Sequence, residues 1–307
     1  MNLIEFGDCR ETMRRWKEQG IKAQTCVTSP PYYGLRDYGH DGQIGLEETP
    51  EEYIKAMVEV FRCVWDVLED DGTLWLNIGD SYCGTGSKGE WVDPKNPEGR
   101  NGQSVSKTQK LAGYKSKDLI GIPWMLAFAL RADGWYLRQD IIWHKPNPMP
   151  ESVKDRCTKA HEYIFLMSKS SKYYFDHESI KEPIKGEPEV RNKNAEGYQA
   201  DYAHGERFSK GERVFGADGM ANKRSVWTVN TKPYKGAHFA VFPQELIEPC
   251  IMAGAPIGGI VLDPFMGSGT TAQVAKHLNR EYLGCELNLG YKPLQDKRLC
   301  QFILDFA

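Results

Sequence analysis

The feature that most constrains the fold is a strand, a glycine-rich turn, a helix and a second strand near the carboxyl end of the chain. It reads GIVLDPFMGSGTTAQVAKHLNREYLGCE and begins at Gly259 of 307 residues. The pattern predicts a buried strand ending at Asp263, a helix opening near Thr270 and a second strand ending at Glu286. Because this unit begins so late, strands from the amino-terminal half must complete its sheet. The sequence therefore predicts a circularly permuted fold.

The rest of the chain alternates predicted strands with predicted helices. Strands are expected at Ala23–Ser29, Thr73–Asp80, Trp135–Lys145 and Glu162–Lys169, and helices at Thr49–Asp70, Leu119–Arg131 and Gln244–Ala253. Alternation of this kind specifies an α/β fold with a doubly wound, mostly parallel sheet that helices cover on both faces. Periodicity disappears between Ser179 and Gly236, which predicts an irregular inserted region.

The glycine-rich turn carries a ligand-binding pattern. Gly267, Gly269 and Ala272 satisfy the G-x-G-x-x-A form of the dinucleotide fingerprint, and Glu286 stands where an acid binds ribose hydroxyls. An NAD-dependent dehydrogenase is one interpretation, and a tight strand–helix turn without a ligand is another. However, Asp263 at the strand tip would repel a pyrophosphate. A carboxylate there favours a cationic or zwitterionic ligand, such as an amino-acid moiety beside a sulfonium.

A second pattern, TSPPYYG, begins at Thr28, directly after a short buried strand. Proline cannot continue a central strand, so the chain must turn sharply at this point. Ordinary surface turns favour Gly, Asn and Asp. A hydroxyl and aromatic rings on a stiff backbone instead indicate a platform for a flat ligand.

Composition excludes several other classes of protein. No apolar run approaches the roughly 20 residues of a membrane span, and the amino-terminal stretch MNLIEFGDCRETMRR has no apolar signal segment. The eight cysteines stand apart, without C-x-x-C pairs or metal-ligand spacing. We therefore expect no membrane segment, no metal site and a cytoplasmic protein with reduced thiols.

The net charge of −3 is unevenly distributed. Residues 137–236 hold 18 basic and 14 acidic residues, and residues 84–117 hold 7 basic and 3 acidic residues, so each segment carries a net charge of +4. The remainder is acidic. Two basic segments on an acidic core are compatible with a polyanionic partner.

Together, DPFMGSGTT and TSPPY resemble the S-adenosylmethionine-dependent DNA methyltransferases that methylate amino groups. The order of the two motifs is that of the permuted β class, and minor similarities such as FGDC, GTLWLNIGD, IIWHKPNPMPE and HFAVFP extend the resemblance over nearly the whole chain. The resemblance implies a Rossmann-like methyltransferase core with an inserted target-recognition region. It also implies double-stranded DNA as the partner and S-adenosylmethionine as the cofactor.

The resemblance also implies a cofactor site and its residues. Asp263, Phe265, Gly267, Gly269 and Thr270 would hold the methionine half, Glu286 the ribose, and Asp8 and Cys9 would flank the adenine. Further candidates for cofactor contact are Thr28, His238, Phe242, Pro264, Ser268, Thr271 and Leu287.

The candidate catalytic residues are Ser29, Pro30, Pro31 and Tyr32. The Ser29 hydroxyl and the Pro30 carbonyl would accept hydrogen bonds from the exocyclic amino group and turn its lone pair toward the methyl group. Tyr32 would stack its ring on a base that has left the duplex, and its hydroxyl has no expected role. A serine at the first position is typical of cytosine-N4 enzymes, and Asp or Asn of adenine-N6 enzymes. Cytosine N4 is thus the expected target.

The expected domain limits follow the motifs. Residues 1–147 would form the catalytic half of the core, with a mobile loop at 84–117. Residues 148–236 would form the target-recognition region, although the strand at 162–168 could instead join the core. Residues 237–307 would form the cofactor-binding half.

Several alternatives stay open at the level of sequence. The target could be adenine N6, and an RNA or small-molecule methyltransferase is a more distant alternative. Cys250 stands in a helix-like run, which argues against the thiol nucleophile of cytosine-C5 enzymes. A bacterial or phage-infected cell is the expected setting, with a cognate restriction endonuclease as a candidate partner. Monomer and homodimer are both compatible with the sequence.

Overall fold

The computed structural model describes residues 1–35, 39–40, 42–84, 111–184, 189–191, 213–215, 219–231 and 242–300. Most of the predicted mobile loop at 84–117 lies outside these residues, as do residues 185–188, 192–212, 216–218 and 232–236 of the predicted target-recognition region. The chain divides into two compact units, residues 1–176 with 225–307 and residues 177–224.

The larger unit is built around one sheet. Its strands are β1 (Leu3–Phe6), β2 (Ala23–Thr28), β3 (Leu68–Ile78), β4 (Tyr136–His144), β5 (His161–Ser168), β10 (Val226–Thr228), β11 (Ile260–Asp263) and β12 (Glu281–Glu286). Its helices are α1 (Cys9–Glu18), α2 (Pro50–Val67), α3 (Ile122–Ala132), α4 (Gln244–Gly254), α5 (Thr270–His277) and α6 (Lys292–Cys300), with a 3₁₀ turn, η2, at Leu289–Tyr291.

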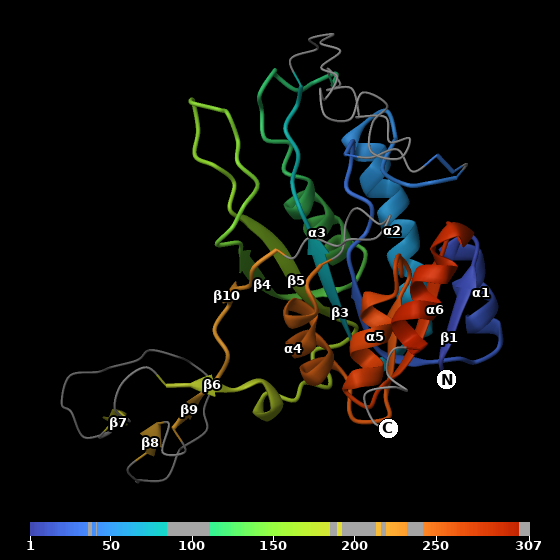
Figure 1. Cartoon of the computed structure of the whole chain (residues 1–307), viewed down its shortest axis with the longest axis vertical. Coiled ribbons are helices and arrows are strands. Elements are labelled where there is room, and N and C mark those ends of the chain that lie inside the picture. The colour runs from blue at the N-terminus through green and yellow to red at the C-terminus, as the bar shows by residue number, and fades with distance from the viewer. Residues whose placement is uncertain are drawn as a thin grey trace. The chain divides into compact units, whose positions relative to one another are not determined.

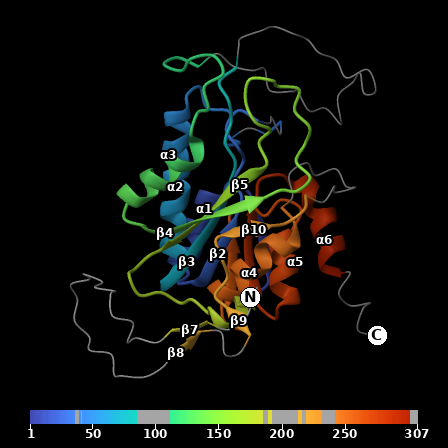
Figure 2. The ribbon, with the colours of Figure 1, turned by 90° about the vertical axis from the view of Figure 1, so that its left-hand side faces the viewer.

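Within the described residues the strand order is β1-β12-β11-β2-β3-β5-β4-β10. The strands β11 and β12 lie between β1 and β2, which confirms that the late unit is completed by amino-terminal strands. The sheet is mostly parallel, but β5 runs antiparallel to both β3 and β4. Figure 2 shows α2 and α3 on one side of the sheet and α4, α5 and α6 on the other. The predicted doubly wound α/β fold is confirmed.

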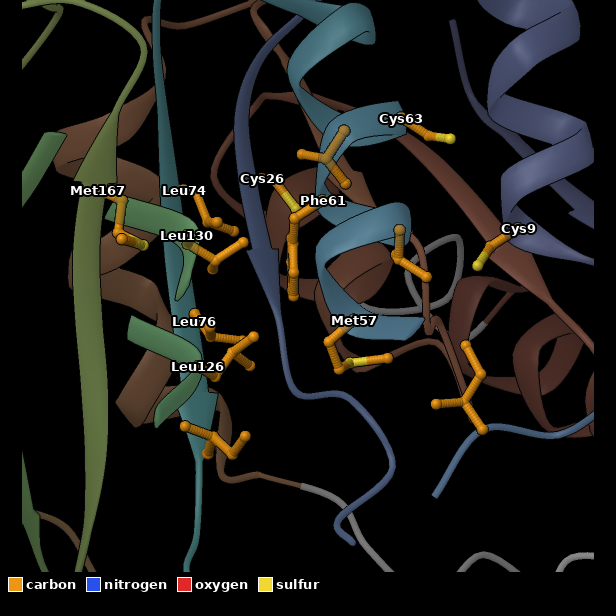
Figure 3. Packing of buried hydrophobic residues seen from close by; sticks show 14 of the residues in the cluster. Cys9, Cys26, Met57, Phe61, Cys63, Leu74, Leu76, Leu126, Leu130 and Met167 are labelled. Atoms are coloured by element: carbon orange, nitrogen blue, oxygen red, sulfur yellow. The ribbon is translucent and has the colours of Figure 1, made fainter. Parts of the chain in front are cut away.

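The helix α2 shows how sequence sets local structure. Thr49 caps its first turn and forms a reciprocal capping box with Glu52, and Pro50 occupies the first turn, where proline fits. Its apolar face buries Met57 and Phe61 against the sheet. Figure 3 shows Phe61 beside Cys26 of β2, with Met57 one turn away along α2. Full burial of each such side chain contributes about 1.5–3 kcal/mol.

Two predicted boundaries are wrong. The helix predicted to begin at Leu119 begins at Ile122. The helix predicted to run from Thr49 to Asp70 ends at Val67, and β3 begins at Leu68 instead of Thr73. Leu68 pairs with Ala23 of β2, after which the ladder shifts register before Thr73 pairs with Thr25. The additional residues at the start of β3, Leu68 to Gly72, form an irregularity in the ladder. Their sequence, LEDDG, does not alternate apolar and polar residues, so strand periodicity does not reveal them.

The smaller unit contains a 3₁₀ turn, η1 (Glu178–Ile180), and two short two-stranded sheets. One pairs β6 (Glu182–Pro183) with β9 (Met220–Ala221), and the other pairs β7 (Glu189–Arg191) with β8 (Arg213–Phe215). This unit is shorter than the predicted region 148–236, because β5 and β10 hydrogen-bond into the large sheet. Both strands belong to the eight-stranded sheet of the larger unit.

Both ends of the described chain belong to the larger unit, as Figure 1 shows by colour. The strand β1 pairs in parallel with β12, so Leu3 lies opposite Leu283. The amino-terminal ammonium of Met1 forms an ion pair with Glu281. No helix in the described part of the chain is both long and apolar enough to span a membrane.

Candidate functional site

The sheet topology brings the two sequence motifs together. The strand β11 pairs in parallel with β2, so Leu262 lies opposite Cys26, and both strands end at the same edge of the sheet. Asp263 is the last residue of β11, and Thr28 is the last residue of β2. Ligands of open α/β sheets bind at this carboxyl edge.

The glycine-rich turn connects β11 to α5. Gly267 has φ +55° and Gly269 has φ +87°, both in the left-handed region that glycine adopts without strain. Gly269 caps α5, and the helix begins at Thr270. The sequence predicted these boundaries, and the backbone amides at the start of α5 are available to an anionic group.

Asp263 is buried beneath this turn, with 1% of its surface exposed. Its Oδ1 accepts from Thr28 Oγ1 at 2.7 Å and from the Phe265 amide at 3.0 Å, and its Oδ2 accepts from Thr271 Oγ1 at 2.6 Å. Burial raises the pKa of this carboxyl to about 6, and the three hydrogen bonds partly oppose that rise. The carboxylate therefore links β2, the turn and α5.

Glu286 stands at the end of the neighbouring strand, β12. Its Oε2 accepts from the Gly267 amide at 2.7 Å and its Oε1 from the Asn288 amide at 2.8 Å. Burial raises the pKa of Glu286 to about 7. Two buried carboxyls with raised pKa values at one edge favour a ligand that carries positive charge, because such a ligand would stabilise their ionised forms.

The candidate adenine-side residues follow β1. Asp8 caps α1, and its carboxylate also binds the Arg10 guanidinium, which lowers the pKa of Asp8. Cys9 is 8% exposed, and burial raises the pKa of its thiol to about 12. The Gly7 amide donates to the Glu286 carbonyl at 2.9 Å, so this segment lies beside the end of β12.

A buried polar atom supports a ligand at the turn. Ser268 is 2% exposed, and its Oγ has no hydrogen-bond partner among the described residues. A buried hydroxyl without a partner costs free energy, so a ligand that hydrogen-bonds to it would offset that cost. The carboxylate of a methionine moiety has the chemistry to do so. Together with Asp263 and Glu286, this atom fits S-adenosylmethionine.

The remaining cofactor candidates differ in how deeply they are buried. Pro264 and Thr270 are buried at the turn, Phe265 and Phe242 are half-buried, and Leu287 is exposed. Thr270 Oγ1 accepts from Arg298 of α6 at 2.7 Å. His238 lies outside the described residues.

The candidate catalytic segment follows β2 as a rigid turn. The Pro31 carbonyl accepts from Tyr53 Oη of α2 at 2.9 Å, which fixes the turn to the core. No donor from the described part of the chain reaches the Pro30 carbonyl. Ser29 is half-buried. The Ser29 hydroxyl and the Pro30 carbonyl are thus two acceptors at the carboxyl edge of the sheet.

Sequence reasoning missed a polar network beneath Tyr32. The Tyr32 hydroxyl donates to Glu162 Oε2 at 2.7 Å, and Lys145 forms an ion pair with Glu162 Oε1. Asn77 donates to the same carboxylate at 3.4 Å. The antiparallel direction of β5 places Glu162, near its start, at the edge where the parallel strands end.

Two further polar side chains near the site, Cys250 and Asp80, have positions that structure alone explains. Cys250 is 1% exposed within α4, and its Sγ lies 3.7 Å from the Leu246 carbonyl, the position of a helix core residue. Asp80 accepts from the Gly121 and Ile122 amides and so caps α3. No group of three or more potential metal ligands occurs among the residues that the structure describes.

Comparison with known proteins places the chain in a family. The N6/N4 methyltransferase family model, described as DNA methylase, matches residues 23–297. The chain belongs to this family. The sequence resemblance is confirmed, and the methyltransferase uses S-adenosylmethionine as its cofactor, as predicted. The dehydrogenase alternative is excluded.

Relatives align along nearly the full methyltransferase. The type II methyltransferase M.SmaI of Serratia marcescens is 49% identical over 300 residues, covering 96% of this chain and 90% of the relative. M.Cfr9I of Citrobacter freundii is 47% identical over 294 residues, covering 95% of this chain and 86% of the relative.

Solved structures share the fold. PvuII DNA methyltransferase (cytosine-N4-specific) superposes with a TM-score of 0.62 at 17% identity, covering 97% of this chain and 86% of that chain. A putative DNA modification methylase of Thermus thermophilus, complexed with S-adenosylmethionine, gives a TM-score of 0.59 at 21% identity, covering 99% of this chain and 95% of that chain. At these identities the similarity concerns the fold.

Proposed function

We propose that this DNA methyltransferase transfers a methyl group to the exocyclic N4 of a cytosine that has left duplex DNA. The observation that carries the proposal is Ser29, the first residue after β2, where adenine-N6 enzymes of the family typically hold Asp or Asn. S-adenosylmethionine, when bound, supplies an electrophilic methyl group that needs no activation. The protein must therefore supply alignment and polarisation of the amino group.

The chain's own residues support this division of roles. The Ser29 hydroxyl and the Pro30 carbonyl would accept the two N–H bonds of the amino group. A fixed Pro31 carbonyl, held by Tyr53, keeps the turn from relaxing when the base enters. Asp263, which binds Thr28 Oγ1, ties the position of this turn to that of the glycine-rich turn. The amino group of the base and the methyl group of the cofactor would thus both be positioned by turns that one buried set of hydrogen bonds connects.

The experiment that tests the proposal is product identification. Duplex DNA that contains varied sequences is incubated with the methyltransferase and labelled S-adenosylmethionine, digested to nucleosides and analysed by mass spectrometry. We expect N4-methylcytosine. N6-methyladenine would overturn the choice of base but not the family, and C5-methylcytosine would overturn the direct-transfer chemistry.

Biological context is a separate part of the proposal. Relatives named type II methyltransferases suggest that the enzyme protects DNA from a cognate restriction endonuclease, in the cytoplasm of a bacterial or phage-infected cell. The basic segments 84–117 and 185–235 would bind phosphates. DNA affinity should then fall steeply with added salt, and a salt-independent affinity would contradict this part.

A further inference from the structure

The Tyr32 hydroxyl lies in a continuous line of hydrogen bonds that starts at the catalytic serine. Ser29 Oγ donates to Tyr32 Oη at 3.5 Å, and Tyr32 Oη donates to Glu162 Oε2 at 2.7 Å. Stacking on a base requires the tyrosine ring and not its hydroxyl. The hydrogen bonds of this hydroxyl therefore call for a separate explanation.

The fold holds the line in place from several sides. The Tyr32 ring lies against Gly79, where an added Cβ would come within 2.7 Å of Tyr32 Cε2. Glu162 sits opposite Trp143 in the ladder between β5 and β4. Asn77 donates to the Tyr163 carbonyl at 3.1 Å and to Glu162 Oε2 at 3.4 Å. Backbone pairing thus fixes the acceptor end of the line.

The two oxygens of the Glu162 carboxylate have different partners, and Oε2 is the one that accepts from Tyr32. Lys145 pairs with Oε1, and the side chains of Lys145 and Glu162 are 17% and 16% exposed, so the carboxylate retains some contact with solvent. Lys159 and His161 are near enough to interact electrostatically with this carboxylate. Burial, with the charge of Glu162, raises the pKa of Tyr32 well above its usual value. The phenol thus keeps its proton at rest and can pass it on only while it receives another.

Methylation of an amino group leaves its nitrogen with one proton too many. The protonated, methylated amino group is a strong acid and gives up a proton readily. A carboxylate accepts that proton more readily than the neutral amino group or a hydroxyl does. We propose that Ser29, Tyr32 and Glu162 form a proton relay that carries this proton from the methylated amino group to the Glu162 carboxylate. The inference rests on the proposed amino-methylation.

The steps balance without another reactant. The N–H bond breaks as a proton joins Ser29 Oγ, and the original Ser29 proton moves to Tyr32 Oη. The original Tyr32 proton moves to Glu162 Oε2, so Ser29 and Tyr32 end as neutral hydroxyls. Glu162 then returns its proton to solvent before the next turnover.

Two substitutions separate proton transfer from positioning. Glu162→Gln preserves size and an acceptor for Tyr32 but cannot take the proton, and Tyr32→Phe preserves the stacking ring but interrupts the line. We expect each to lower the single-turnover methylation rate about 10²-fold, the lower end of general-base effects. The affinity for S-adenosylmethionine, measured by calorimetry, should be unchanged. The matched control is Tyr33→Phe, because the buried Tyr33 hydroxyl donates only to the backbone carbonyl of Glu48 in the described structure, at 3.2 Å.

Chemical rescue gives a readout that a positioning role would not produce. In Glu162→Ala, added formate should restore part of the rate, whereas formamide, which has a similar shape and accepts a hydrogen bond, should not. Equal rescue by both molecules, or a Glu162→Gln rate within twofold of wild type, would overturn the relay. Product identification with the wild-type enzyme tests the amino-methylation independently, so the two failures can be told apart.

Discussion

The buried link between Thr28 and Asp263 makes a prediction about stability that depends on pH. Thr28→Val replaces a hydroxyl by a methyl group of similar size and removes the donor that lies 2.7 Å from Asp263 Oδ1. The carboxyl group is 1% exposed, so water cannot easily replace the lost hydrogen bond. The substitution should therefore destabilise the fold.

The magnitude follows from the ionisation of Asp263. Its folded pKa, about 6, exceeds the ordinary value of 3.8, so the carboxyl favours folding below pH 3.8 and loses that contribution as the pH rises through 6. At pH 8 it is ionised, and a hydrogen bond to a charged group contributes about 1.5–3 kcal/mol. At pH 5 it is mostly protonated, and a neutral hydrogen bond contributes about 0.5–1.5 kcal/mol. Thr28→Val should cost correspondingly more at pH 8.

Urea unfolding at pH 5 and pH 8 measures the two free energies. The control is Thr25→Val in the same strand, because Thr25 is also buried, but its Oγ1 pairs with the neutral Thr73 Oγ1 at 2.8 Å. Its cost should be about the same at both pH values. If Thr28→Val also costs the same at both, Asp263 is not ionised as described, and the reasoning fails.

Three further predictions concern the site. The affinity for S-adenosylmethionine should fall as the pH drops below about 7, because protonated Glu286 cannot accept from both ribose hydroxyls. Calorimetry should show a weaker affinity in Glu286→Gln that changes less between pH 6 and 8, with only the contribution of Asp263 remaining, and equal wild-type affinities at pH 6 and 8 would contradict this. Ser29→Ala should lower the single-turnover rate by roughly two to three orders of magnitude, as loss of one transition-state hydrogen bond does, without weakening cofactor binding; an unchanged rate would remove Ser29 from catalysis. Cys250→Ala should retain methylation in the same assay, because this buried thiol lies in a helix core, and complete loss of activity in a folded variant would argue for a thiol nucleophile.

The two main motifs could be placed from the sequence because their information is local. Asp263 and Gly269 sit at a strand end and a helix start that periodicity and glycine reveal directly. The sequence also indicated that amino-terminal strands complete the sheet, but the pairing of β11 with β2, which brings Asp263 to Thr28, is visible only in the structure.

Glu162 could not be found in this way. It lies in a predicted strand, but its place beside Tyr32 depends on β5 running antiparallel to its neighbours. The direction of a strand within a sheet cannot be predicted from its local sequence pattern. Lys145 reads as a solvent-exposed residue at a strand end, whereas pairing with Glu162 draws it into the network. The carboxylate of Asp263 was likewise expected to face the ligand, but its hydrogen bonds to two threonines depend on tertiary packing.

The strand order has a consequence for how the protein folds. β1 and β2 are consecutive in the chain, yet β11 and β12, made more than 200 residues later, separate them in the sheet. In a growing chain on the ribosome, β2 can pair with β3 early, but β1 would lack its neighbour β12, and β2 its second neighbour β11, until synthesis is nearly finished. Sheets closed by such distant contacts fold slowly. The cofactor site, which needs both ends of the chain, should be the last part to form, so nascent fragments would have no methylating activity.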